Sequence, residues 1–316
     1  MELNQIHELY LSCSAISTDT RNIETGAMFF ALKGPSFNGN KYALNAIDKG
    51  AKFAIVDEVS VPLNDKIIQV DDVLTTLQDL ARFHREYLGL PIIALTGSNG
   101  KTTTKELINV VLSKKYKTKA TIGNLNNHIG VPLTILSVGK DAEMAVIEMG
   151  ANHQLEIASY CAYTLPTHGM ITNCGKAHLE GFGGVEGVKK GKGELFDFLR
   201  ANNGTVFLME DFDYLVEMAH GIQDVIAYGK EQGQIQGEAI DQNGMLSVQF
   251  KKGIDIASIQ THLVGNFNLP NVLAAVTIGQ YFKVPNEKIK SAIEDYVPTN
   301  SRSQLLTWNN NEVILD

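Results

Sequence analysis

Runs of consecutive apolar residues alternate with segments of helical period along most of this chain. Between residues 92 and 296 the apolar runs predict strands at 92–96, 144–149, 168–173, 204–209 and 224–228. Strands that are apolar at successive positions are typical of a parallel sheet buried on both faces. We therefore expect an α/β domain in which helices cover both faces of a mostly parallel sheet. Ligands of such sheets bind at the carboxyl ends of the strands.

The first 88 residues predict a smaller α/β unit of their own. Short strands are expected at 28–32, 53–56 and 67–70, with helices near 43–47 and 73–87. A link follows at Leu88-Gly89-Leu90-Pro91, because proline disfavours the helical conformation at the residue before it.

The pattern changes again after residue 230. Residues 235–240 and 245–250 flank Asn243-Gly244, a strong hairpin signal, and predict a small antiparallel appendage to the central domain. After Pro298 a strand–turn–strand pattern begins and continues to the end of the chain. The predicted domains are therefore 1–88, 89–297 and 298–316, the last being the start of a further domain.

The segment PIIALTGSNGKTTTK, residues 91–105, carries the clearest chemistry. An apolar strand turns through glycines into a helix, and the free N–H groups at such a helix start bind phosphate oxygens. Lys101 adds a point charge for the outer phosphates, and the hydroxyl of Thr102 suits a magnesium ion. We expect ATP or GTP to bind here, although an ordinary strand–turn–helix with a surface lysine remains an alternative. The candidate phosphate-binding residues are Gly97, Ser98, Asn99, Gly100, Lys101, Thr102 and Thr103.

Composition narrows the class of protein. A net charge of −8 and the absence of a long basic run argue against a nucleic-acid partner or an anionic membrane surface. The polar N-terminus and the lack of a long apolar stretch predict neither a signal peptide nor a membrane span. Three cysteines without metal-like spacing are typical of reduced thiols in a cytoplasmic protein. We also expect the protein to be a monomer.

The loop TGSNGKTT is a compressed phosphate loop, because Leu95 stands where the common loop has its first glycine. This form resembles the Mur ligases and the folylpolyglutamate synthases, which use ATP to form amide bonds; the latter lack the first domain. Further segments similar to Mur ligases occur in the family's order: STDTRNIETGAMFFALKG, TIGNLNNHIGVPLTIL, IEMGANHQLEI, ITNCGKAHLEGFGGVEGVKKGKGELF and LVGNFNLPNVLAAV. Together they cover nearly the whole chain.

Within the family, the segments at 121–136, 147–157 and 171–196 are most similar to the branch that adds D-alanyl-D-alanine. The resemblance implies an ATP-dependent ligase that joins D-alanyl-D-alanine to UDP-N-acetylmuramoyl-tripeptide in peptidoglycan precursor synthesis. A substrate carboxylate would attack the γ-phosphate, and the incoming amine would displace phosphate from the acyl phosphate. Two alternatives remain: the ligase that adds lysine or diaminopimelate to the dipeptide precursor, and a non-catalytic nucleotide-binding protein.

The resemblance also implies two Mg²⁺ ions and a lysine carbamylated by CO2. Glu148 ends an apolar strand, where a metal ligand would reach the cleft. Lys192 would be the carbamylated residue, with Lys190 as the alternative, and the reaction needs a neutral amine and hence a lowered pKa. Histidine is an unusual ligand for magnesium, and His178 is placed near the second ion by the resemblance alone. The implied metal ligands are Thr102, Glu148, His178 and carbamylated Lys192, and the implied catalytic residues are Lys101, Glu148, His178 and Lys192.

The remaining candidates concern the two nucleotides. Asn268 and Asn271 suit adenine because an amide both donates and accepts, although Phe267 stands where the family commonly has histidine. Arg302 would reach the γ-phosphate, and Arg21 is the natural partner of a diphosphate, with a surface salt bridge as its alternative. The implied contacts with the UDP-sugar peptide are Thr18, Asp19, Thr20, Arg21, Asn38, Gly39 and, equally suited to turns, Asn124, Asn126 and Asn127.

Mur ligases carry a Rossmann-like C-terminal domain that binds the incoming amine and closes over ATP. This chain ends at Asp316, where that domain would begin. The resemblance therefore implies a truncated form that binds its substrates but ligates them weakly, because the amine is not positioned and water is not excluded.

Overall fold

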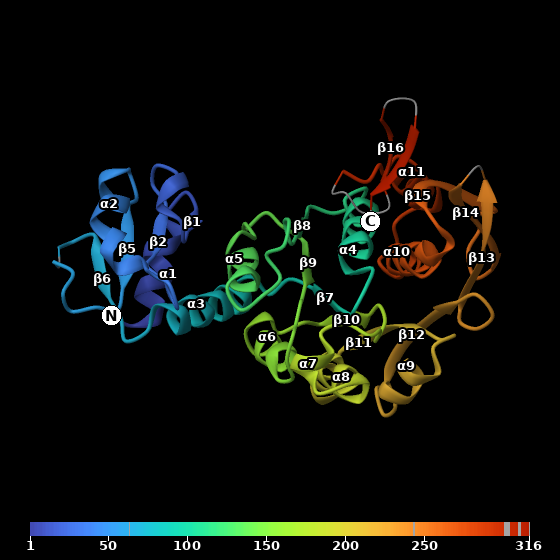
Figure 1. Ribbon diagram of the computed structural model, residues 1–316, viewed down its shortest axis with the longest axis horizontal. Coiled ribbons are helices and arrows are strands. Elements are labelled where there is room, and N and C mark those ends of the chain that lie inside the picture. Colours follow the sequence, from blue (N-terminus) through green and yellow to red (C-terminus); the bar gives the residue numbers. More distant parts are fainter. Residues whose placement is uncertain (63, 243, 300–303, 309–310, 316) are drawn as a thin grey trace. The chain divides into compact units, whose positions relative to one another are not determined.

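The structure is a computed structural model that describes residues 1–62, 64–242, 244–299, 304–308 and 311–315 (Figure 1). The chain forms two compact units. The first contains residues 1–89 together with 123–140 and 162–165, and the second contains 90–122, 141–161 and 166–316. The domain boundaries expected at residues 88 and 297 remain a prediction.

The first unit contains a parallel sheet with the order β1-β2-β5-β6 among its described strands. These strands are β1 (Ile16–Ser17), β2 (Met28–Phe30), β5 (Phe53–Val56) and β6 (Ile67–Gln69). Phe29, Ala54 and Val56 are buried and pack with alanines of helix α2 (Ala43–Asp48), which covers one face. A small hairpin of β3 (Lys33–Gly34) and β4 (Phe37–Asn38) follows β2. Short helical turns at Thr20–Asn22 and Gly39–Tyr42 complete this part.

The helices α1 (Leu3–Leu11), α3 (Val73–Leu88) and α5 (Gly130–Leu136) form the rest of the first unit. Helix α3 begins where the Asp72 carboxylate accepts the N–H of Thr75 at 2.7 Å and ends at Gly89, whose φ is +63°. Between α1 and α3, His7 Nε2 lies 3.1 Å from His84 Nδ1, and both rings are buried. Local capping thus defines both ends of α3, and the buried histidine pair joins it to α1.

The second unit contains a sheet with the order β15-β14-β13-β12-β11-β10-β7-β9-β8 among its described strands. From β8 to β13 neighbouring strands are parallel, which confirms the predicted α/β class with a mostly parallel sheet. The parallel strands are β7 (Ile92–Thr96), β8 (Thr118–Ala120), β9 (Met144–Glu148), β10 (His168–Ile171), β11 (Thr205–Met209) and β12 (Asp224–Gly229). Strand β8 was not predicted, because Thr-Lys-Ala carries no apolar run.

The predicted antiparallel hairpin is confirmed as β13 (Ile235–Gln242) and β14 (Met245–Lys252). This antiparallel part is attached to the central domain through the sheet itself, because β13 pairs with β12 and β14 pairs with β15 (Ser258–Val264). A second hairpin, β16 (Gln304–Trp308) with β17 (Asn311–Leu315), follows the strand–turn–strand pattern expected after Pro298.

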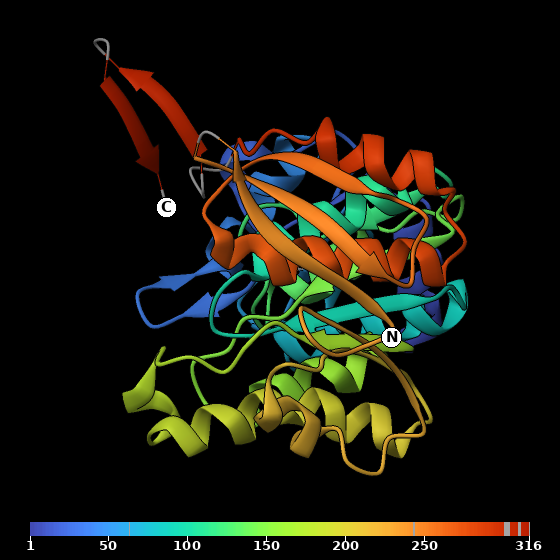
Figure 2. The same cartoon turned by 90° about the vertical axis from the view of Figure 1, so that its right-hand side faces the viewer.

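Helices cover both faces of this sheet (Figure 2). Helix α8 (Val185–Ala201) packs against β7, β10 and β11, and Gly169 of β10 leaves room for its Leu195 and Leu199. On the other face α10 (Leu269–Tyr281) packs against α4 (Lys101–Leu112), where a side chain at Gly279 would meet Val111 at 2.5 Å. Helices α7 (Leu179–Phe182), α9 (Asp213–Met218) and α11 (Asn286–Glu294) also belong to this unit, and α6 (Glu156–Thr164) begins in it, while residues 162–164 of α6 are counted with the first unit.

No described helix is both long enough and apolar enough to cross a membrane.

Candidate active site

The predicted phosphate loop joins the buried strand β7 to α4 at the carboxyl end of the sheet. Both of its glycines are required by the geometry. Gly97 has a φ of +149°, and a Cβ there would collide with the side chain of Thr172. Gly100 has a φ of +80°, and its Cβ would lie 2.7 Å from Oδ1 of Asn271. Larger residues would strain the backbone and push the loop away from its supports.

The loop is held from the neighbouring strand end by two residues that follow β10. Thr172 Oγ1 donates to the carbonyl oxygen of Asn99 at 2.6 Å. Asn173 accepts the Asn99 N–H through Oδ1 at 3.1 Å and the Ser98 N–H through its main-chain carbonyl at 2.9 Å. Sequence reasoning did not single out Thr172 and Asn173, although their place directly after an apolar strand of the same sheet was a usable signal.

The charged and hydroxyl groups at the start of α4 face the end of β9. Lys101 Nζ donates to the carbonyl oxygens of Gly97 at 2.8 Å and Ser98 at 3.1 Å, so the ammonium lies over the loop. Thr102 Oγ1 donates to Glu148 Oε1 at 3.4 Å, and Glu148 is 1% exposed. A hydroxyl and a carboxylate are oxygen ligands of the kind that Mg²⁺ prefers, so these two residues fit such an ion.

Lys192 is a buried amine on the inner face of α8. It is 2% exposed, and its Nζ donates to the carbonyl oxygen of Ala151 at 3.2 Å. Burial, reinforced by the charge of Lys101, lowers the pKa of Lys192 to about 8. Lys190 is exposed, so the environment that favours a neutral amine belongs to Lys192.

His178 is at the protein surface, in the loop that follows β10. It is exposed and precedes α7 with a φ of +53°. Over the described part of the chain, no three His, Cys, Asp or Glu side chains gather as metal ligands. The structure therefore brings Thr102 and Glu148 together but does not assemble a cluster of such ligands around His178.

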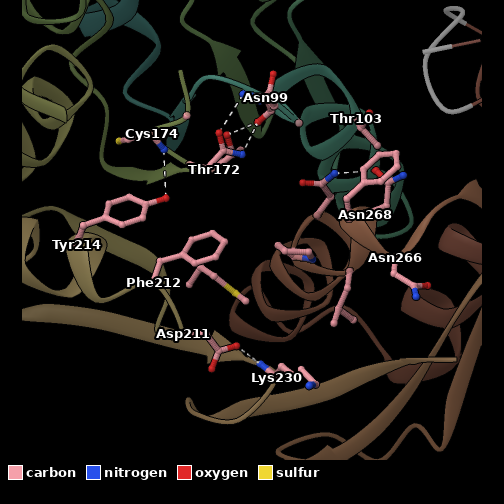
Figure 3. A pocket seen from close by; sticks show the side chains of 18 residues that line it. Asn99, Thr103, Thr172, Cys174, Asp211, Phe212, Tyr214, Lys230, Asn266 and Asn268 are labelled. Atoms are coloured by element: carbon pink, nitrogen blue, oxygen red, sulfur yellow. Dashed lines mark hydrogen bonds between the residues drawn. The ribbon is translucent and has the colours of Figure 1, made fainter. Parts of the chain in front are cut away.

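A cavity of about 960 Å³ adjoins the phosphate loop (Figure 3). It lies at the ends of β10, β11 and β12 and at the start of α10, the position at which such sheets bind ligands. Its walls combine loop residues with apolar side chains. The lining residues that the sequence did not indicate include Met209, Asp211, Phe212, Tyr214 and Lys230.

Asn268 and Asn271 line this cavity, but their amides also hold the fold together. Thr104 Oγ1 donates to Asn271 Oδ1 at 3.0 Å, and Asn271 Nδ2 donates to Asn268 Oδ1 at 2.9 Å. Asn268 Nδ2 then donates to the carbonyl oxygen of Val264 at 2.9 Å. This chain of hydrogen bonds ties α4 to α10. Phe267, by contrast, is 64% exposed and lines the cavity, and its role in base stacking remains a prediction.

The candidate sugar-nucleotide residues lie in the first unit. Arg21 forms an ion pair with Asp19 at 2.6 Å, and the hydrogen bonds from Arg21 lower the pKa of Asp19 to about 2. Arg21 is therefore engaged in the surface salt bridge that was its alternative role. Thr18 and Thr20 flank this pair and are partly buried.

Asn38 ends the small hairpin, and Gly39 follows it. Asn38 Nδ2 donates to Glu58 Oε1 at 2.7 Å, and a Cβ at Gly39 would lie 2.6 Å from the carbonyl oxygen of Leu32. Asn127 Oδ1 accepts the N–H groups of Ile129 and Gly130, which starts α5.

Asn124 and Asn126 belong to the same turn, since the N–H of Asn126 donates to the carbonyl oxygen of Asn124 at 2.8 Å. These asparagines thus have turn roles, and their contact with a substrate remains a prediction. Arg302 lies outside the described residues.

Comparison with known families decides the assignment. The family model described as "Mur ligase middle domain" matches residues 95–279, which contain the phosphate loop, Glu148, Lys192 and the cavity. The chain belongs to the Mur ligase family. A second model, "Mur ligase family, catalytic domain", matches residues 12–85 of this Mur ligase.

Individual relatives agree with the family. This Mur ligase is 32% identical to the UDP-N-acetylmuramoyl-tripeptide--D-alanyl-D-alanine ligase of Bacillus subtilis, over 92% of the chain and 64% of the relative. It is 33% identical to the enzyme of that name from Escherichia coli, over 97% of the chain and 68% of the relative. The chain thus spans about two thirds of the length of these relatives.

Solved structures show the same fold. MurF from Acinetobacter baumannii superimposes with a TM-score of 0.86 at 29% identity, covering 98% of this chain and 71% of that one. MurF ligase from Thermotoga maritima in complex with ADP superimposes with a TM-score of 0.82 at 26% identity, covering 94% of this chain and 69% of that one.

Proposed function

We propose that this Mur ligase serves the ATP-dependent joining of D-alanyl-D-alanine to UDP-N-acetylmuramoyl-tripeptide. Relatives with that printed name are similar over most of the chain, and a structural neighbour was solved with ADP. The observation that carries the proposal is the arrangement of Lys101, Thr102 and the buried Glu148 at a glycine-pinched loop beside a nucleotide-sized cavity.

The reaction brings two anions together, because a substrate carboxylate must approach the γ-phosphate. Lys101 and the N–H groups at the start of α4 lie where they can neutralise charge on the phosphates. Thr102 and Glu148 would hold a Mg²⁺ ion, which when bound screens the outer phosphates.

The second part of the proposal concerns Lys192. A pKa of about 8 leaves about a tenth of the amine neutral at pH 7, whereas an ordinary lysine is almost wholly charged. A neutral amine can add CO2, and the resulting carbamate replaces a buried cation by a carboxylate-like group. That group is an oxygen ligand suited to a second Mg²⁺ ion, with His178 nearby in the family scheme.

The proposed division of labour follows the sequence-based domains. Residues 1–88 would bind the UDP-sugar, residues 89–297 would bind ATP, and residues from 298 would begin a third domain. Since UDP-sugar peptide and ATP are cytoplasmic metabolites, we place the protein in the cytoplasm. We also propose that it is a monomer.

Binding selectivity tests this function without requiring turnover. Calorimetric titration of the chain should show binding of UDP-N-acetylmuramoyl-tripeptide and at least about tenfold weaker binding of the dipeptide precursor. A preference for the dipeptide would favour the ligase that adds lysine or diaminopimelate. Binding of neither precursor would leave only a nucleotide-binding protein.

A further inference from the structure

The far end of the cavity is built around one carboxylate. Asp211 follows β11, and its Oδ1 accepts the N–H groups of Glu231 and Gln232, each at 3.1 Å. Its Oδ2 accepts the N–H of Lys230 at 2.5 Å. Both oxygens are therefore engaged by the loop that connects β12 to β13, and this loop carries Lys230 to the cavity wall.

Two glycines let the loop close tightly around this carboxylate. A Cβ at Gly229 would lie 2.8 Å from Oδ2 of Asp211. Gly233 has a φ of +103°, and a Cβ there would lie 2.7 Å from the Cα of Tyr228. The backbone of the loop 229–233 thus wraps around the carboxylate of Asp211.

The loop lies away from the phosphate end. Figure 3 shows Asp211 and Lys230 at the opposite side of the cavity from Asn99 and Thr172, with Phe212 between the two groups. If the phosphates lie at the start of α4, a nucleotide that fills the cavity brings part of its nucleoside end to the Asp211 side.

We propose that Asp211 is a positioning residue for the nucleoside end of the bound nucleotide, because it holds the 229–233 loop that closes that end of the cavity. The inference rests on the proposed ATP binding. Asp211 does not need to touch the nucleotide or a metal ion. Its negative charge, which would otherwise repel a polyanion, is compensated by three N–H groups.

Asp211→Asn and Asp211→Ala, measured by calorimetry with Mg²⁺, test this role against two probes. In Asp211→Asn one accepting oxygen becomes an NH2 group, which cannot accept a hydrogen bond from the N–H groups of the loop. The loop should therefore be held less firmly, and ADP should bind about tenfold more weakly. Inorganic tripolyphosphate, which lacks a nucleoside, should bind within about twofold of the unaltered chain. Asp213→Asn is the matched control, because Asp213 is an exposed carboxylate two residues away and outside the cavity lining.

The sign of the effect separates the explanations. If Asp211 acted only through its charge, Asp211→Asn would bind ADP more tightly, and that result would overturn the proposal. Equal weakening of ADP and tripolyphosphate would also overturn it, since Asp211 would then support the whole site. Hydrogen exchange supplies the second readout: the N–H groups of residues 230–232 should exchange faster in Asp211→Ala while the rest of the unit is unchanged.

Failure of the proposed function gives a different pattern. If the unaltered chain binds neither ADP nor tripolyphosphate, ATP binding itself is wrong and the inference falls with it. If it binds tripolyphosphate as tightly as ADP, the phosphate loop stands but the nucleoside-end assignment is overturned.

Discussion

Replacing Gly97 by alanine should disrupt the phosphate loop more than the positive φ alone explains. The φ of +149° disfavours any L-residue and costs about 1–2 kcal/mol. The new Cβ also collides with the Thr172 side chain, which must leave the rotamer from which Oγ1 donates to the Asn99 carbonyl. The lost hydrogen bond and the strained rotamer add about 1–2 kcal/mol, so the total is about 3 kcal/mol.

A double-mutant cycle isolates the collision. Thr172→Ala removes the colliding atom, and the next contacts of the Cβ, at 3.1 Å, need only a small shift. Gly97→Ala should therefore cost about 1–2 kcal/mol less in the Thr172→Ala background than in the unaltered chain. Gly89→Ala is the control for φ, because Gly89 has a φ of +63° and open space around its Cβ position.

Urea unfolding and the affinity for ADP are the two assays. Gly97→Ala should lower both the unfolding free energy and the ADP affinity, whereas Gly89→Ala should lower only the former, by about 1 kcal/mol. Additive effects of Gly97→Ala and Thr172→Ala would refute the reasoning, because they would show that the two side chains do not compete for space.

Three further predictions follow from buried ionisable groups. Burial, then the charges of His84 and Lys140, lowers the pKa of His7 from 6.5 to about 4. The contribution of neutral His7 to the free energy of unfolding is therefore complete above pH 6.5 and is lost as the pH falls toward 4. The loss should be about 1–2 kcal/mol after solvent screening. Urea unfolding of His7→Phe should show a flatter dependence of stability on pH. With ¹³C-bicarbonate, NMR should detect a carbamate that persists in Lys190→Ala and disappears in Lys192→Ala; the opposite pattern would reverse the assignment. Glu148→Gln should remove most of the increase in ATP affinity that Mg²⁺ produces, so that calorimetry in the presence of Mg²⁺ shows about tenfold weaker ATP binding than for the unaltered chain. An unchanged effect of Mg²⁺ on ATP affinity would exclude Glu148 as a ligand.

The sequence predicted those features that depend on periodicity and local turn chemistry. Strand β7 coincides with the predicted 92–96 run, and the helix expected after the glycine turn is α4, which begins at Lys101. The resemblance favoured Lys192 and kept Lys190 as the alternative; in α8, Lys192 is buried and Lys190 is exposed. These features depend on residues that are neighbours in the chain.

The features that sequence reasoning missed depend on partners far apart in the chain. Thr104 and Asn271 are separated by 167 positions, and no local pattern shows that the amide bonds to this hydroxyl. Asp211 reads as a solvated residue after a strand, yet its role is set by a loop about 20 residues later. Strand β8 has no apolar run and is a strand because it pairs with the edge of β9. Periodicity reports burial, but not which buried groups meet.

Titration of the chain with ATP and Mg²⁺ tests the central claim most directly. The account predicts a saturable heat that Lys101→Ala weakens by about a hundredfold, since a charge-assisted contact with phosphate is worth about 2–3 kcal/mol. Lys119→Ala, which removes a lysine from β8 in the same unit, should bind as the unaltered chain does. Absence of heat from the unaltered chain, or equal binding by Lys101→Ala, would contradict the account.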